Sequence, residues 1–94
     1  MKIKNINGTA GNKCKCGTWL QHWEKFAGRS LPTFCAEKNC SKTDLVGAHV
    51  QKDSAIDRSW YIVPLCSGHN RTANEIEILD TIPLVSANVT NTCK

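Results

Sequence analysis

The pattern of apolar positions first indicates a helix in the N-terminal third of the chain. Three aromatic residues recur there at helical spacing: Trp19, Trp23 and Phe26. We expect this face to pack on the core rather than to serve as a base-stacking platform. Thr18, with Gln21 three residues later, matches a capping box, and Gly28 suits a helix end. The pattern therefore predicts a helix between Thr18 and Gly28.

Two later runs, LVGAHVQKD and SWYIVPL, are rich in β-branched and aromatic residues. The polar link between them contains Asp53, Ser54 and Asp57. Residues of this kind between two such runs are typical of a turn that joins paired strands. The two runs therefore predict a β-hairpin with a long loop.

The remaining segments complete the predicted fold. CSGHNRTANEIEIL has good helix formers after Thr72, and Ile76 and Leu79 stand three apart, which predicts a helix that begins near Cys66. Pro83 ends any helix, and LVSANVT alternates enough to form a last strand. The first thirteen residues suit either a mobile arm or one short leading strand. We predict one α+β domain over residues 1–94.

Composition indicates how so small a domain is stabilised. A chain of 94 residues buries a modest core, and it contains six Cys and three His. The first residues lack the apolar core of a signal peptide, and no apolar run is long enough to span a bilayer. We therefore expect a cytoplasmic protein without membrane contact. Clustered Cys and His more often bind zinc than form disulfides in a reducing compartment.

Two close pairs of metal-type ligands flank the predicted hairpin. Cys35 and Cys40 are separated by four residues, and Cys66 and His69 by two. Zn²⁺ takes four such ligands in a tetrahedron, and a tight turn and the first turn of a helix can each supply two. The spacing predicts a structural zinc site. The alternative is that these Cys are small buried residues and His69 a surface residue.

The other three cysteines allow a second zinc site. Cys14 and Cys16 precede the first predicted helix, Cys93 lies near the C-terminus, and His22 stands one turn into that helix. Together they form a Cys₃His set that would tie the two ends of the chain together. A disulfide from Cys93 to one of the pair, or three free thiols, are the alternatives, and His22 could be an exposed helix residue.

The order of cysteine turn, β-hairpin and helix is that of a treble-clef zinc finger. The text CAEKNC, then GAHV, then YIVPLCSGHNRT resembles the HNH (His-Asn-His, His-Me finger) endonuclease superfamily over about residues 34–79. The run VPLC followed by two residues and a ligand is the most specific part. The resemblance implies a treble-clef, ββα-metal core, to which the predicted N-terminal helix and C-terminal strand are additions.

The resemblance also implies roles for three residues. His49 matches the general base that deprotonates water for attack on a phosphodiester, Asn70 falls where the catalytic Mg or Mn is bound, and Tyr61 falls where the middle Asn stands. Ala48 occupies a position where relatives often carry a metal-binding Asp. The alternatives are that His49 fills space in a strand, that Asn70 caps a helix and that Tyr61 packs in a strand.

Charge gives a mild indication of the partner. The formal net charge is +4, which favours an anionic partner. The resemblance places five cations where nucleic acid would lie, although they could equally form a solvated rim: Lys38, Lys42, Lys52, Arg58 and Arg71. Two functions follow, a divergent metal-dependent nuclease that cuts DNA or RNA, or a non-catalytic zinc module that binds nucleic acid or protein.

Overall fold

The computed structural model describes residues 1–6, 18–53, 56–72 and 74–87. Its strands are β1 (Lys2–Asn5), β2 (Leu45–Lys52), β3 (Tyr61–Cys66), β4 (Ile76–Glu77) and β5 (Val85–Ser86), and its helices are α1 (Trp19–Ala27) and α2 (Ser67–Asn70). The strands form one antiparallel sheet in the order β4-β1-β2-β3-β5. The prediction of an α+β domain with an N-terminal helix and a C-terminal strand is confirmed.

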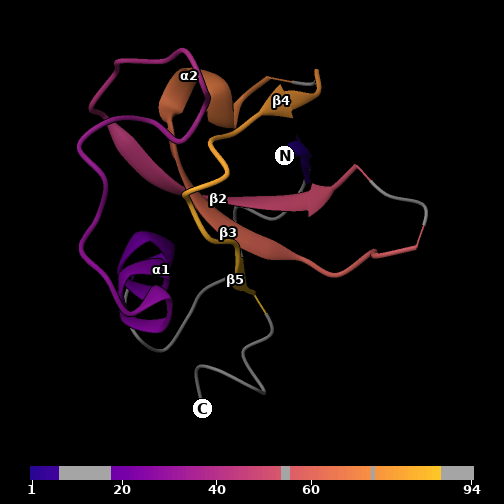
Figure 1. Cartoon of the computed structure of the whole chain (residues 1–94), viewed down its shortest axis with the longest axis horizontal. Helices are drawn as coiled ribbons and strands as arrows, with labels where there is room; N and C mark the ends of the chain where they lie inside the picture. The colour runs from indigo at the N-terminus through magenta and orange to yellow at the C-terminus, as the bar shows by residue number, and fades with distance from the viewer. Residues whose placement is uncertain (7–17, 54–55, 73, 88–94) are drawn as a thin grey trace.

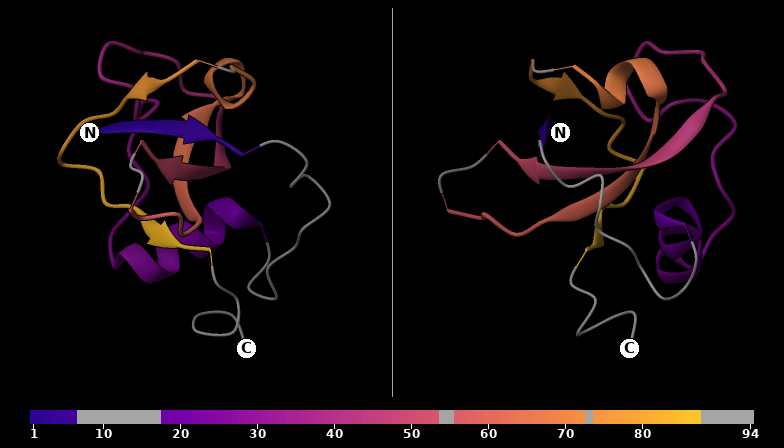
Figure 2. Two further views of the ribbon diagram at one scale, coloured as in Figure 1. Left: turned by 90° about the vertical axis from the view of Figure 1, so that its right-hand side faces the viewer. Right: turned by 180° about the vertical axis from the view of Figure 1, so that it is seen from behind.

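The two helical parts lie at opposite ends of the molecule. Figure 1 shows α1 at one end and α2 with β4 at the other, while the β2–β3 hairpin projects away from both. Both views in Figure 2 show the same separation, and the left view shows β1 running between β2 and β4. Among the described residues, neither helix has the length and apolar character needed to cross a bilayer.

Helix α1 forms as its capping residues predict. The Thr18 hydroxyl accepts from the Gln21 backbone N–H, the Gln21 side chain accepts from the Thr18 N–H, and Gly28 adopts φ 69° at the other end. Trp23 is fully buried and donates from its indole N–H to the Pro83 carbonyl at 2.9 Å. Phe26 of the predicted aromatic face is 38% exposed, and its ring contacts that of the buried His22 at a centroid distance of 4.9 Å.

The sheet and α1 share one core. It combines apolar side chains from all five strands and α1: Ile3, Trp23, Ala48, Val50, Ile62, Val63, Leu65, Ile76 and Val85. Nearly continuous burial along β3 explains its run of apolar residues, because both of its faces are covered. The predicted hairpin is confirmed, with Val50 opposite Tyr61 and Leu45 opposite Cys66.

The predicted helix after Cys66 is wrong beyond its first turn. Helix α2 ends at Asn70, and the chain then enters β4, where Ile76 pairs with Ile3 of β1. Ile76 and Ile78 are buried while Glu77 between them is exposed, which is the alternation of a strand. Pairing with β1 therefore overrides the helix-forming residues after Thr72. The leading strand is present as β1, and within the described residues the predicted last strand comprises the two residues of β5.

Close approach of α1 to β2 requires a glycine. A Cβ atom added at Gly47 would lie 2.5 Å from the backbone carbonyl carbon of Trp19 and 2.6 Å from the backbone nitrogen of Leu20. These are backbone atoms at the start of α1, so they cannot move aside as a flexible side chain would. Glycine at this position allows the helix to contact the sheet directly.

Gly47→Ala should therefore destabilise the domain by about 1–3 kcal/mol, because the new methyl group forces α1 away from β2. Gly68→Ala is a matched control, since the nearest atom to a Cβ there is 4.0 Å away. Urea unfolding at a fixed zinc concentration measures both variants. Equal stability of Gly47→Ala and the parent would show that α1 does not need this close contact.

Candidate metal centre

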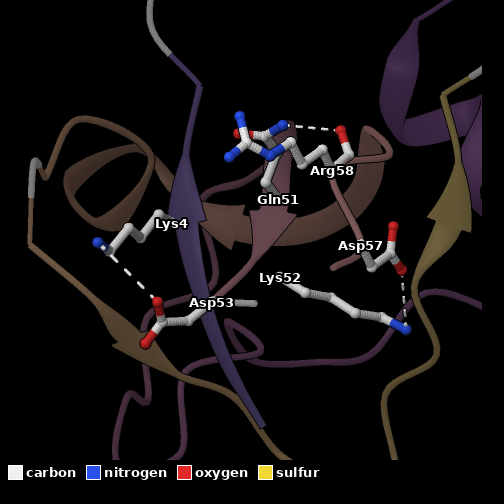
Figure 3. A pocket seen from close by; sticks show the side chains of 6 residues that line it. All are labelled: Lys4, Gln51, Lys52, Asp53, Asp57 and Arg58. Atoms are coloured by element: carbon white, nitrogen blue, oxygen red, sulfur yellow. Dashed lines mark hydrogen bonds and ion pairs between the residues drawn. The ribbon is translucent and has the colours of Figure 1, made fainter. Parts of the chain in front are cut away.

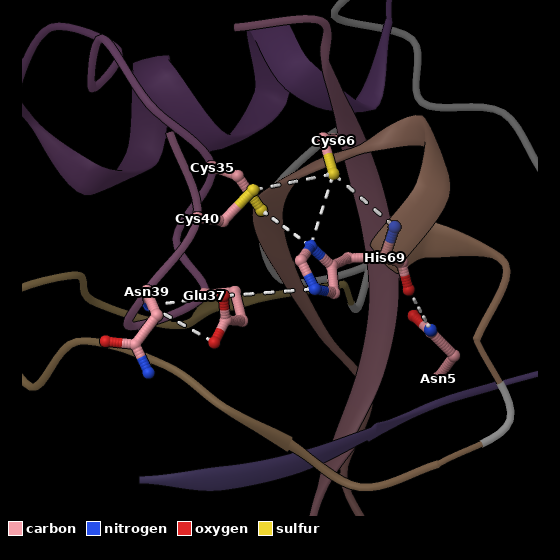
Figure 4. A network of polar contacts seen from close by, with 7 residues as sticks. All are labelled: Asn5, Cys35, Glu37, Asn39, Cys40, Cys66 and His69. Atoms are coloured by element: carbon pink, nitrogen blue, oxygen red, sulfur yellow. Dashed lines mark hydrogen bonds and ion pairs between the residues drawn. The ribbon is translucent and has the colours of Figure 1, made fainter. Parts of the chain in front are cut away.

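Four ligand atoms from the two predicted pairs lie together at the end of β3. The atoms of Cys35, Cys40, Cys66 and His69 all fall within 4.8 Å of one another, and we call these residues the Cys₃His cluster. The Cys40 and Cys66 sulfurs are 3.9 Å apart. The His69 Nδ1 lies 3.2 Å from the Cys66 sulfur and 3.5 Å from the Cys35 sulfur (Figure 4). The cluster could bind a metal ion.

The turn around Cys35 is held by backbone hydrogen bonds. The Cys35 N–H donates to the Lys42 carbonyl at 2.9 Å, and the Cys40 N–H donates to the Glu37 carbonyl at 3.1 Å. The Ala36 N–H donates to the Pro64 carbonyl of β3, which fixes the turn against the sheet. These backbone hydrogen bonds therefore place Cys35 and Cys40 beside β3.

The other two ligands come from the junction of β3 and α2. Cys66 is the last residue of β3 and caps α2, where its sulfur accepts from the His69 backbone N–H at 3.4 Å. Asp44 strengthens the same helix start, because its carboxylate accepts from the Ser67 N–H and hydroxyl. One helical turn thus brings the His69 ring back over the Cys66 sulfur.

The His69 ring is oriented from both sides. Its Nδ1 faces the sulfurs, and its Nε2 faces the Glu37 carboxylate at 3.9 Å (Figure 4). The amide of Asn5 on β1 donates to the carbonyls of His69 at 2.7 Å and Thr72 at 3.0 Å, and so holds the end of α2. A carboxylate on the far nitrogen of a ligand histidine orients the ring and sets its tautomer. Nδ1 is therefore the atom through which His69 could bind a metal ion.

Burial affects the thiols unequally. Burial raises the pKa of Cys35 to about 12. For Cys66 burial also raises the pKa, but hydrogen bonds from His69 and the neighbouring thiols outweigh it, and the pKa lies below its ordinary value. Buried thiols of this kind become thiolates when a cation lies among them. A dication bound among these cysteines would therefore favour their thiolate form.

The spacing of the cluster fits zinc. With metal–sulfur and metal–nitrogen bonds of about 2.3 and 2.0 Å, a tetrahedral site places sulfurs about 3.8 Å apart and nitrogen about 3.5 Å from sulfur. The Cys40–Cys66 separation of 3.9 Å and the Cys35–His69 separation of 3.5 Å match these values. Three thiolates and one imidazole are ligands that zinc accepts readily.

Of the four residues of the second predicted zinc site, the structure describes His22. Cys14, Cys16 and Cys93 lie outside the described residues. His22 is fully buried, with its Nε2 2.8 Å from the Ser86 carbonyl of β5, so the alternative of an exposed helix residue is wrong. The second zinc site remains a prediction.

His49 lies in an aromatic environment. Its ring, 7% exposed, contacts Trp19 of α1 at a centroid distance of 4.5 Å and Trp60 at 6.4 Å. Burial, with a smaller contribution from the charge of His22, lowers the pKa of His49. The imidazole is therefore neutral at pH 7. Its described contacts are those of a strand residue packed beneath α1.

The other two residues with implied catalytic roles have different surroundings. The Tyr61 hydroxyl donates to Asp57 at 2.6 Å, and this bond is the largest cause that lowers the pKa of Asp57 to about 2. Asn70 is exposed at the end of α2. Among the described residues, no hydrogen bond or ion pair joins His49, Tyr61 and Asn70.

Two residues that support the cluster were not predicted from the sequence. Glu37 lies between the two cysteines of CAEKNC, and a carboxylate inside a ligand turn is a signal that could have been noticed. Asn5 is 64 residues from His69, so only the pairing of β1 with β2 and β4 brings it to α2. Nothing local to Asn5 in the sequence indicates that contact.

The lowered pKa of His49 should make part of the stability depend on pH. The unfolded imidazole has its pKa near 6.5 and the folded one below it, so the unfolded state binds more protons in that interval. This contribution is fully present above about pH 6.5 and is lost as the pH falls toward the folded pKa. His49 changes the number of bound protons by at most one, so it adds at most about 1.4 kcal/mol per pH unit to the slope of the unfolding free energy against pH.

The measurement is urea unfolding of the parent and of His49→Gln between pH 5 and pH 8 (roughly the range in which histidine titrates). Zinc ligands also bind protons on acidification, and this effect is common to both proteins. The difference between their slopes isolates His49. Parallel stability curves for the two proteins would contradict a depressed His49 pKa.

No family model, curated protein or solved structure matches this chain. What is established about the site therefore rests on geometry: an α+β domain brings three cysteines and one histidine close enough to hold a metal ion.

Proposed function

We propose that this chain is a zinc-dependent binding module in which the Cys₃His cluster holds one structural Zn²⁺ and the fold presents a surface to nucleic acid. The observation that carries the proposal is the convergence of four ligand atoms within 4.8 Å from two segments of the chain. Cys40 and Cys66 are 26 residues apart, with the whole β2 strand between them. A metal that joins them closes this long loop.

The ligand set supports a structural rather than a catalytic zinc. Four protein ligands fill the tetrahedron, whereas catalytic zinc sites keep one position for water or substrate. Cys35 and Cys66 are each only 1% exposed, which restricts access of substrate to the ion. A closed site of this kind contributes its binding free energy to folding.

The resemblance to the HNH superfamily supports the same frame without requiring catalysis. In this hypothesis the cysteine turn, hairpin and short α2 are a treble-clef arrangement whose helix is reduced to one turn. Ala48, which has no donor atom, stands where a metal-binding carboxylate is expected. The net charge of +4 favours an anionic partner such as nucleic acid.

A divergent nuclease is the second candidate, and the neutral state of His49 favours it. The lowered pKa of His49 favours the neutral imidazole, which is the form that can accept a proton from water. The carboxylates that could have held a catalytic cation have other partners: Asp44 binds Ser67, Asp53 pairs with Lys4, and Asp57 binds Tyr61 and Lys52. This arrangement makes the non-catalytic module the better-supported function.

Folding should depend on zinc. Removal of the ion by a strong chelator leaves buried thiols without their cation, so the circular dichroism of the folded domain should be lost and should return when Zn²⁺ is added. Cys40→Ala removes one of four ligands and should give molten or insoluble protein. Ser41→Ala, one residue away and exposed, is the control and should retain zinc and fold.

Native mass spectrometry counts the ions in the parent and both variants. One Zn²⁺ per chain is expected from the Cys₃His cluster, and a second that disappears in Cys93→Ser would come from the other predicted site. A parent that folds equally well without any metal would disprove the proposed role of zinc.

The non-catalytic module should not cut DNA. Supercoiled plasmid incubated with zinc-loaded protein and Mg²⁺ or Mn²⁺ should show no nicking above the buffer control. Nicking that falls about 100-fold to 10,000-fold in His49→Ala, with zinc content unchanged, would establish the nuclease instead. Weaker nicking by Asn70→Ala that recovers at higher Mg²⁺ would then assign metal binding to Asn70.

A further inference from the structure

The β2–β3 hairpin carries basic, amide and aromatic side chains on one face of the sheet. Lys4 of β1 and Gln51 of β2 are register partners, so their side chains share a face. The Gln51 amide donates to the Arg58 carbonyl at 2.8 Å. His49, two residues before Gln51, lies on the same face, and its ring contacts Trp60. We call Lys4, Gln51, Arg58 and Trp60 the hairpin face.

A hollow opens at this part of the molecule. Figure 3 shows the six side chains that line it: Lys4, Gln51, Lys52, Asp53, Asp57 and Arg58. Two ion pairs cross it, Lys4 with Asp53 at 4.0 Å and Lys52 with Asp57 at 3.4 Å. Within the described part of the chain, the Arg58 guanidinium makes no ion pair. The hollow therefore has one more cation than carboxylates.

The ion pairs leave the charge of Lys4 available to a ligand. The Lys4–Asp53 distance is at the upper limit for an ion pair, and the two side chains are 59% and 41% exposed. Exposed pairs of this kind contribute little to stability. A phosphate that approaches Lys4 and Arg58 can therefore replace Asp53 as the partner of Lys4 at small cost.

Trp60, two residues after Arg58 in the sequence, adds an exposed aromatic surface. The residue is 43% exposed although tryptophan is usually well buried. Its backbone carbonyl accepts from the Ala87 N–H at 2.9 Å, and one side of its ring contacts His49. The backbone is thus fixed while part of the indole remains open to solvent.

We propose that the hairpin face binds single-stranded nucleic acid, with a base stacked on Trp60 and phosphates paired with Lys4 and Arg58. This proposal rests on the proposed binding module and identifies its partner and surface. Aromatic side chains interleaved with cations are the combination that binds single strands, because every unpaired base offers a face for stacking. Bases in a duplex are already stacked on one another, so a duplex gains only the phosphate contacts.

The test is fluorescence anisotropy of a labelled oligothymidylate of about 12 nucleotides, titrated with zinc-loaded protein at low salt. Trp60→Ala should weaken binding about tenfold, and Trp60→Phe, which keeps an aromatic face, should recover most of the loss. Lys4→Ala and Arg58→Ala should each reduce the affinity. Each should also reduce the magnitude of the slope of the logarithm of the binding constant against the logarithm of salt concentration by about 0.7.

Two charge variants make the test specific. Asp53→Asn should strengthen binding, because it removes both the competitor for Lys4 and a negative charge from the hollow. Lys38→Ala is the matched control, since this exposed lysine belongs to the cysteine turn and not to the hairpin face. It loses the same charge as Lys4→Ala and should leave affinity nearly unchanged.

Several results would overturn the proposal. These are no binding at low salt, binding that is unaffected by Trp60→Ala, equal losses in Lys38→Ala and Lys4→Ala, and tighter binding to a duplex or to polyglutamate than to the single strand. Zinc content is measured on every variant in parallel. Absence of binding by a parent that retains one Zn²⁺ would contradict the hairpin-face proposal alone. A parent that folds without zinc would contradict the proposed zinc-dependent module.

Discussion

The Cys₃His cluster is the constraint on which the rest of this structure depends. Three thiols and one imidazole are gathered within 4.8 Å, and two of the thiols are almost fully buried. Charged sulfurs at this separation repel one another and burial alone opposes their ionisation, so a bound cation would favour the ionised form of the cluster. The cluster joins the cysteine turn to the end of β3 and the start of α2, and Glu37 and Asn5 fix the orientation of His69.

The opposite end of the molecule is determined by steric fit rather than by ligand chemistry. Gly47 allows the backbone of α1 to contact β2, and the buried Trp23 anchors the helix through the Pro83 carbonyl. His49 and His22 are enclosed in the same region and contact Trp19 from two sides. Their enclosure explains why His49 has the lowered pKa of a base while its contacts are those of a packed residue.

Stability and recognition therefore involve different parts of the sheet in our proposal. The metal cluster lies where β3 meets α2, while the hairpin projects in another direction in both Figure 1 and Figure 2. Residues of the hairpin face can be exchanged without removing a zinc ligand. In this proposal the ion joins the cysteine turn to the end of β3 and the start of α2, and exposed side chains of the hairpin contact the partner.

Local chemistry in the sequence predicted α1, the hairpin and two pairs of candidate metal ligands. Thr18, Gln21 and Gly28 mark the ends of the helix, and the members of each pair, Cys35 with Cys40 and Cys66 with His69, are close enough in sequence to meet within one turn of chain. Only the tertiary structure determined that Ile76 and Glu77 form a strand instead of a helix, because Ile76 and Ile78 are buried by β1 and the cysteine turn, which are remote in sequence. The tertiary structure likewise brings Asn5 of β1 against α2 and the His49 ring against Trp19. Such contacts between distant segments depend on strand pairing and leave no local signal in the sequence.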